Sequence, residues 1–85
     1  MQEIQKGLIV RTISGHDKNT IYLVSEVNNN FVLLTNGKNR SIDNPKKKNI
    51  KHVVKVGLSK ELLDLMNNNK LDNSIIINIL KNYNL

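Results

Sequence analysis

The sequence contains no cysteine, no tryptophan and a single proline, Pro45. The lack of cysteine excludes disulfides and thiolate metal sites, and a small domain without such cross-links is expected in a reducing compartment. No apolar run approaches the roughly 20 residues that span a bilayer, and residues 1–6 are polar where a signal peptide needs an apolar core. We therefore expect a cytoplasmic protein with no membrane partner.

Aromatic residues are also scarce, being limited to Tyr22, Phe31 and Tyr83. The apolar residues are instead almost all Ile, Leu and Val, which predicts an aliphatic, β-branched core of the kind that suits strands. With 85 residues, the chain is long enough for one compact domain and too short for a second large one.

Positive charge is abundant, and it is unevenly distributed along the chain. The net charge is +6, and residues 1–57 hold ten Lys or Arg and four acids, whereas residues 58–85 hold three of each. The whole excess therefore lies in the first two-thirds of the chain. This distribution predicts a polyanionic partner for that part.

Short β-rich segments separated by turn residues fill residues 1–57, a pattern typical of a small barrel. The pair Asn36-Gly37 predicts a two-residue type I′ hairpin, because that turn needs positive φ at both central positions. Pro45 cannot donate to a central ladder, so residues 43–49 should form a loop or a sheet edge. The expected strands are residues 7–13, 20–27, 31–35, 38–42 and 50–56.

After Gly57 the apolar period becomes helical. Ser59 is a suitable N-cap for a helix that ends near Asn67, and Asp72 or Asn73 can cap a second helix. The Ile-rich run of the second segment also permits a strand, but its length and cap favour a helix. No linker rich in Gly, Pro or Ser precedes this part, so we expect a hairpin over residues 58–85 packed against the first part as one folding unit.

Two stretches of the sequence resemble a known family. The motif that KOW modules of ribosomal proteins and transcription elongation factors carry is similar to Gly7-Leu8-Ile9-Val10, Ser14-Gly15-His16-Asp17-Lys18-Asn19 and Ile21-Tyr22-Leu23-Val24. Small stand-alone bacterial KOW proteins, similar to large-subunit ribosomal proteins of the KOW type, resemble the later stretch Leu33-Leu34-Thr35-Asn36-Gly37-Lys38-Asn39-Arg40 with Asn44-Pro45-Lys46-Lys47-Lys48 and Lys51-His52.

The resemblance implies a mainly β fold with a C-terminal α part: an SH3-like five-stranded barrel over residues 1–57, followed by the helical hairpin of residues 58–85. It also implies contact with structured RNA, often ribosomal RNA, through the loops and an exposed face. Asn19 stands where the family has a glycine, and Asn is the other residue that best tolerates left-handed backbone angles. His16 stands where Arg is common in the family.

The candidate RNA-binding residues form two groups. The main group lies between Lys38 and Lys55, where seven cations accompany one acid and several can reach phosphates together. The alternative is that this lysine run only solubilises a sheet edge. Arg40 is the first choice in this group, because a guanidinium can bind a phosphate through two hydrogen bonds. Asp17, in the first loop, is expected to organise the loop backbone. The candidates of the main group are Arg40, Lys38, Lys46, Lys47, Lys48 and Lys51. The second group consists of Lys18 and His16 in the first loop and Arg11 in the strand before it.

Catalysis finds little support in the sequence, because there is no cysteine nucleophile, no His with an acidic partner at a spacing that suggests a dyad, and no Gly-rich phosphate loop before a helix. We expect a monomeric, non-enzymatic protein without cofactor, metal or small-molecule substrate, whose partners are RNA, above all ribosomal RNA, and ribosomal proteins. Scarce aromatics favour folded or double-stranded RNA over single strands. Two alternatives remain. One is a DNA-binding protein. The other is a protein-docking module that uses the SH3-like barrel or the apolar C-terminal helices, and in the second case Ile75, Ile79 and Tyr83 would be exposed.

Overall fold

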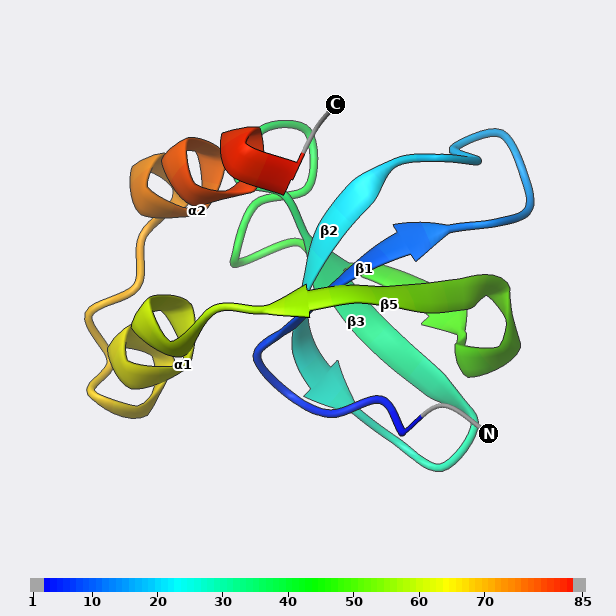
Figure 1. Cartoon of the computed structure of the whole chain (residues 1–85), viewed down its shortest axis with the longest axis horizontal. Helices are drawn as coiled ribbons and strands as arrows, with labels where there is room; N and C mark the ends of the chain where they lie inside the picture. The colour runs from blue at the N-terminus through cyan, green and yellow to red at the C-terminus, as the bar shows by residue number, and fades with distance from the viewer. Residues whose placement is uncertain (1–2, 84–85) are drawn as a thin grey trace.

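The computed structural model describes residues 3–83. Residues 1–2 of the first expected part and residues 84–85 of the second lie outside it. Five antiparallel strands form one sheet in the order β4-β3-β2-β1-β5, and two helices follow (Figure 1). The strands are β1 (Leu8–Thr12), β2 (Ile21–Val27), β3 (Phe31–Thr35), β4 (Lys46–Asn49) and β5 (Val53–Leu58). The helices are α1 (Lys60–Asn67) and α2 (Asn73–Leu80), with 3-10 turns η1 (Ile50–His52) and η2 (Lys81–Tyr83).

The sheet is strongly curled. Its two edge strands, β4 and β5, are consecutive in the chain and are joined only by the three residues of η1. The η1 turn is tied to two loops, because the Ile50 N–H donates to the Asn30 carbonyl at 3.0 Å and the Ile13 N–H donates to the His52 carbonyl at 2.9 Å. Bulges between Ile9 and Val10 and between Val24 and Glu26 add the local twist that such a curl requires.

The concave side of the sheet holds the first core cluster. Alternate residues of each strand point to this side, as the period-two pattern of a strand dictates. The cluster is aliphatic apart from Tyr22, and Ile4 and Ile50 pack against it. Its buried members are Leu8, Val10, Tyr22, Val24, Val32, Leu34 and Val53.

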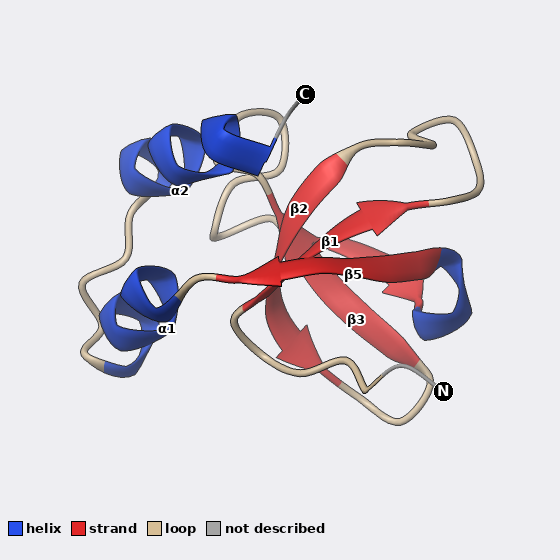
Figure 2. Ribbon diagram, viewed as in Figure 1, coloured by secondary structure: helices blue, strands red, loops and turns tan. Residues whose placement is uncertain are grey.

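The other side of the central strands holds a second cluster, which the helices cover (Figure 2). Ile9 and Leu23 leave the sheet on this side and meet Leu62 of α1 and Ile76 and Leu80 of α2. Because β1 and β2 are thus buried on both faces, the helices belong to the same packed structure as the sheet.

The helix ends follow the capping signals of the sequence. The Ser59 hydroxyl accepts a hydrogen bond from the Leu62 N–H at 3.2 Å, and the Asp72 carboxylate accepts one from the Ile75 N–H at 2.9 Å. Helix α1 ends in a Schellman motif in which Asn69 has a φ of +56°. The prediction of two helices with these boundaries is confirmed.

The predicted strand over residues 38–42 is wrong. The Asn36 side chain accepts hydrogen bonds from the Lys38 and Arg40 N–H groups, and the Ile42 N–H donates to the Asn73 side chain at 2.9 Å. These bonds use the donors that a ladder would need. The fourth strand is instead β4, at the sheet edge after Pro45, and residues 50–52 of the expected last strand form η1.

The type I′ turn is also wrong, because among the described residues only Gly37 of that pair has a positive φ, +80°. The Asn36 and Gly37 N–H groups both donate to the Arg40 carbonyl, which closes a wider loop. The coarser prediction, a mainly β protein with C-terminal helices, is confirmed. No helix within residues 3–83 has the length and apolar character needed to cross a membrane.

Candidate nucleic-acid interface

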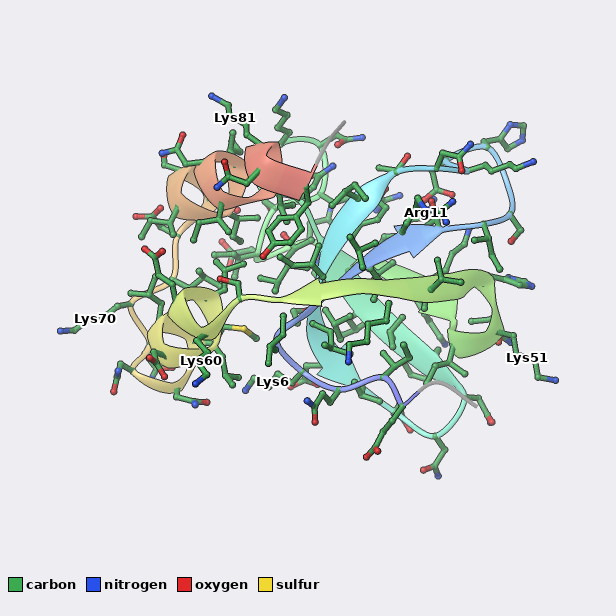
Figure 3. The ribbon with its side chains drawn as sticks, viewed as in Figure 1. Lys6, Arg11, Lys51, Lys60, Lys70 and Lys81 are labelled. Atoms are coloured by element: carbon green, nitrogen blue, oxygen red, sulfur yellow. The ribbon has the colours of Figure 1, made fainter. Side chains whose placement is uncertain are left out.

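Three basic segments lie together at the end of the sheet away from the helices (Figure 1). We call this region the basic end; it comprises the β1–β2 loop (residues 13–20), β4 and η1. The η1 turn contacts the loop through the Ile13 to His52 hydrogen bond, and β4 contacts it through Lys48, whose Nζ donates to the Ser14 carbonyl at 2.9 Å. Figure 3 shows Arg11 and Lys51 at this end, opposite Lys60 and Lys70 of the helical side.

Asp17 is the centre of a charged network at the basic end. Its two carboxylate oxygens lie 3.0 Å from the Lys46 Nζ and 2.9 Å from the Lys48 Nζ. The hydroxyl of the buried Tyr22 donates to the same carboxylate at 3.2 Å. The Lys48 side chain is only 11% exposed, so its charge is held inside the fold. Asp17 therefore fastens the β1–β2 loop to the edge strand through its carboxylate, while its backbone carbonyl accepts a hydrogen bond from the Thr20 N–H at 3.2 Å within the loop.

The network shifts the ionisation of both acidic groups. Burial by itself would raise the pKa of the Asp17 carboxyl, but the hydrogen bonds and charges of Lys48 and Lys46 outweigh it and lower that pKa from 3.8 to about 2. Burial raises the pKa of the Tyr22 phenol, and the Asp17 carboxylate raises it further, against the opposing charge of Arg40. Asp17 is therefore ionised and Tyr22 neutral at physiological pH.

The Lys46-Lys47-Lys48 run is divided between the two sides of β4, because successive side chains of a strand point in opposite directions. Lys46 and Lys48 turn toward Asp17, whereas Lys47 turns away and is exposed. The Lys47 Nζ lies 4.2 Å from the centre of the Phe31 ring, a cation–π contact that leaves the ammonium in water. The run thus presents one exposed ammonium on its outer side and not three together.

The β1–β2 loop has a fixed backbone that carries Lys18 and His16 on its exposed surface. Thr12 holds the loop through two hydrogen bonds: its hydroxyl donates to the Asp17 carbonyl, and its carbonyl accepts one from the Asn19 N–H at 2.7 Å. Asn19 has a φ of +68°, which confirms that it occupies a turn of left-handed backbone. Its side chain also accepts a hydrogen bond from the Arg11 guanidinium at 3.0 Å, which orients Arg11 toward the loop.

Lys38 and Arg40, predicted to belong with the lysine run, lie on the β3–β4 loop (residues 36–45). This loop packs against α2, where a Cβ on Gly37 would come 2.5 Å from the Asn73 carbonyl oxygen. Lys38 is exposed there, and Arg40 is half-buried, near enough to Tyr22 for its charge to act on the phenol. The predicted residues thus form a main set at the basic end, while Lys38 lies where the loop packs on α2 and Arg40 lies in the same loop near Tyr22, whose hydroxyl is bonded to Asp17.

The role of Asp17 could not be predicted from the sequence, because its lysine partners lie about 30 residues away along the chain. One feature of the sequence could have indicated this role. Asp17 is a single acid in a basic segment, and nearby cations stabilise an ionised carboxylate. Within residues 3–83, no cluster of three or more His, Cys, Asp or Glu side chains is placed to hold a metal ion.

No family model matches the sequence, and no curated protein matches it at a significant level. The interpretation of the basic end therefore depends on its own residues, their exposure and their charges.

Proposed function

We propose that the protein is a non-enzymatic RNA-binding protein of the KOW type that contacts folded RNA, with ribosomal RNA as the leading target class, through its basic end. The observation that carries the proposal is the distribution of charge there. Lys18, Lys47 and Lys51 are exposed, while the only carboxylate of the region is already bound to Lys46 and Lys48. The region therefore keeps a net positive charge that a phosphate backbone would neutralise.

The curled sheet supports an SH3-like barrel as the scaffold of this surface. The two sheet edges are joined by a three-residue turn, and the β1–β2 loop reaches across to β4 through Asp17. In this arrangement the side chains of Asp17, Lys46 and Lys48 span the gap between the loop and the edge strand. The barrel presents its loops as a rigid platform, which reduces the ordering cost of binding.

In the proposed mechanism the two sets of lysines have different tasks. Lys18, Lys47 and Lys51, with Arg11 and His16 beside them, contact phosphates and sugars, which positions the RNA without reading its sequence. Lys46 and Lys48 support the platform, because Asp17 occupies their ammonium groups. Phe31, which pairs with Asn49 of β4, lies beside this surface, and Lys47 lies over its ring. The scarcity of Phe, Tyr and Trp favours recognition of RNA shape over stacking on single-stranded bases.

The test is a triple variant, Lys18→Ala with Lys47→Ala and Lys51→Ala, measured for binding to a duplex RNA at several salt concentrations. We expect affinity at low salt to fall by about 10- to 100-fold. The slope of log affinity against log salt should become shallower by about 2 to 3, since each phosphate contact contributes about 0.9.

The matched control is Lys6→Ala with Lys60→Ala and Lys70→Ala, which removes the same charge from exposed positions outside the basic end. A folded control should retain the slope of the parent protein. Equal losses in the two triple variants would mean that net charge alone attracts the RNA, and the proposal would then be abandoned.

Docking through the helices, one form of the docking alternative, loses the observation on which it depended. Ile75, Ile79 and Tyr83 are half-buried and pack against the second core cluster, so the apolar face of the helices is directed at the sheet. The DNA alternative is separated by competition: at fixed salt, duplex RNA should displace a labelled duplex RNA at lower concentration than duplex DNA of the same length does. Equal competition would argue for a general duplex-binding protein.

A further inference from the structure

A cavity on the helical side of the molecule adjoins the basic end only through Thr20, the last residue of the β1–β2 loop. It has a volume of about 250 Å³ and lies where three distant segments meet: the start of β2, the β3–β4 loop and the last turn of α2. Its polar rim carries Lys38, Lys81 and Asn36, and its floor is formed by Ile21, Ile77 and Leu80. None of the residues that line it is acidic.

The two lysines of the rim come from elements that are fixed to one another. Gly37, beside Lys38, approaches α2 so closely that a Cβ would come 2.9 Å from Ile77 Cγ1, and the Ile42 N–H donates to the Asn73 side chain. Lys81, the C-cap of α2 with helical backbone angles, lies one turn beyond Ile77 on the same face. The loop and the helix thus hold Lys38 and Lys81 at one opening.

The chemistry of the cavity fits one unit of a sugar–phosphate backbone. Two exposed ammonium groups favour an anion, the amide of Asn36 and the hydroxyl of Thr20 suit a hydroxylated group, and the aliphatic floor suits the carbon face of a ribose. The volume lies below the about 300–1,000 Å³ of pockets that enclose a whole drug-sized ligand. A single nucleotide unit of a longer chain is therefore a better fit than a complete cofactor.

We infer that this cavity is a second phosphate contact of the RNA, in which Lys38 and Lys81 neutralise a backbone phosphate while Ile77 and Leu80 contact the attached ribose. The inference rests on the proposed function and extends the contact surface from the basic end to α2. It gives the C-terminal part, which has no net charge, a direct role in binding through Lys81.

The first experiment compares two double variants of equal charge. Lys38→Ala with Lys81→Ala removes the rim of the cavity, and Lys60→Ala with Lys70→Ala removes two exposed lysines from the other side of the helices. We expect the first pair to weaken duplex RNA binding by about 5- to 20-fold and to reduce the salt slope by about 1 to 2. The second pair should leave both quantities close to those of the parent protein.

The second experiment observes the cavity directly through the methyl groups of Ile77 and Leu80 in NMR spectra of the parent protein. Saturable shifts of these methyls on addition of duplex RNA support the inference. Unchanged methyls in an RNA-bound protein overturn it, as does a Lys38/Lys81 variant that binds like the Lys60/Lys70 variant.

These outcomes separate the inference from the proposed function. If the variant at Lys18, Lys47 and Lys51 loses binding and the Lys38/Lys81 variant does not, the basic end stands and the cavity contact is rejected. If no variant changes a salt-dependent affinity, both fail. A titration with adenosine monophosphate forms the last arm: shifts at Ile77 and Leu80 that duplex RNA does not reproduce would assign the cavity to a free nucleotide and overturn the inference.

Discussion

The two ends of the sheet are held by different forces. At the basic end, the β1–β2 loop is fastened to β4 by the carboxylate of Asp17, which binds Lys46, Lys48 and Tyr22. At the opposite, helical end, α1 and α2 are fastened to β1 and β2 by fully or nearly fully buried aliphatic side chains, such as Leu62 and Ile76. Charge and hydrogen bonding hold one end, and apolar burial holds the other.

This difference separates stability from binding. Burial of aliphatic surface is insensitive to pH and is the larger source of stability, at about 1.5–3 kcal/mol for each fully buried side chain. Ion pairs near the surface contribute about 1 kcal/mol or less and weaken with salt. Of the two ends, the helical end should therefore contribute more to the free energy of unfolding, while the basic end carries charge that remains available to a polyanion.

The largest expected effect is at the helical end. Ile76→Ala removes a side chain with no exposed surface and leaves a cavity between α2 and the sheet, so we expect a loss of about 3 kcal/mol in the free energy of unfolding by urea denaturation. The control, Val56→Ala, changes a side chain that is 41% exposed and should cost well under about 1 kcal/mol. Similar losses in the two variants would mean that the helices contribute little to the core.

Two glycines with positive φ compare the ends directly. Gly37→Ala should cost about 2 kcal/mol, because it adds a strained backbone angle and a Cβ 2.5 Å from the Asn73 carbonyl oxygen. Gly15→Ala at the basic end would place a Cβ 3.0 Å from the Lys48 Nζ and 3.6 Å from Asp17 Oδ1, with no backbone atom as close, and should cost about 1 kcal/mol, mainly from the backbone angle. The midpoints of urea denaturation measure both. An equal cost would show that the β3–β4 loop can move away from α2.

Asp17→Asn tests the charged network. It leaves the nearly buried ammonium of Lys48 without its counterion, and we expect a loss of about 1–2 kcal/mol at neutral pH. Because high salt screens the ion pairs of the parent protein, the difference between parent and variant should shrink as salt is raised. A difference that is independent of salt would mean that packing of the loop, and not charge, fastens the basic end.

The same network predicts a dependence of stability on acid. The Asp17 pKa is about 2 in the folded protein and 3.8 for an ordinary carboxyl, so the folded state binds the proton less well than the unfolded state does. The stabilisation is complete above about pH 4 and is lost as the pH falls through 3.8 toward 2. After screening it should amount to about 1 kcal/mol. Stability measured from pH 5 to pH 2 should fall by that much more in the parent protein than in the Asp17→Asn variant.

The smallest expected effect is a gain. Asn69→Gly at the end of α1 relieves a left-handed residue in a Schellman motif and should stabilise the protein by about 0.5 kcal/mol. Asn19→Gly at the basic end relieves a similar angle but removes the acceptor of the Arg11 hydrogen bond, so its gain should be smaller. Thermal denaturation in parallel compares the two. A larger gain at Asn19 would show that the bond to Arg11 contributes nothing.

Local patterns predicted the parts of the fold that depend on neighbouring residues. Ser59 and Asp72 were identifiable as caps because a cap needs only a side-chain oxygen two or three residues before its donor. The left-handed angle of Asn19 was expected from the resemblance to the KOW family, which has a glycine at that position. The strand over residues 38–42 failed because its donors are taken by Asn36 and by Asn73 of α2, and the second of these partners lies far away in sequence.

The sequence by itself determined where the positive charge lies, the two C-terminal helices, the first three strands and an aliphatic core, since composition and periodicity act over a few residues. Only the tertiary structure decided which cations are available. The curl of the sheet brings Asp17 to Lys46 and Lys48, and the alternation of β4 leaves Lys47 outside. Lys38 likewise lines the same cavity as Lys81 only because the β3–β4 loop packs on α2. Contacts between segments depend on how the sheet curls and the helices pack, and no local pattern specifies them.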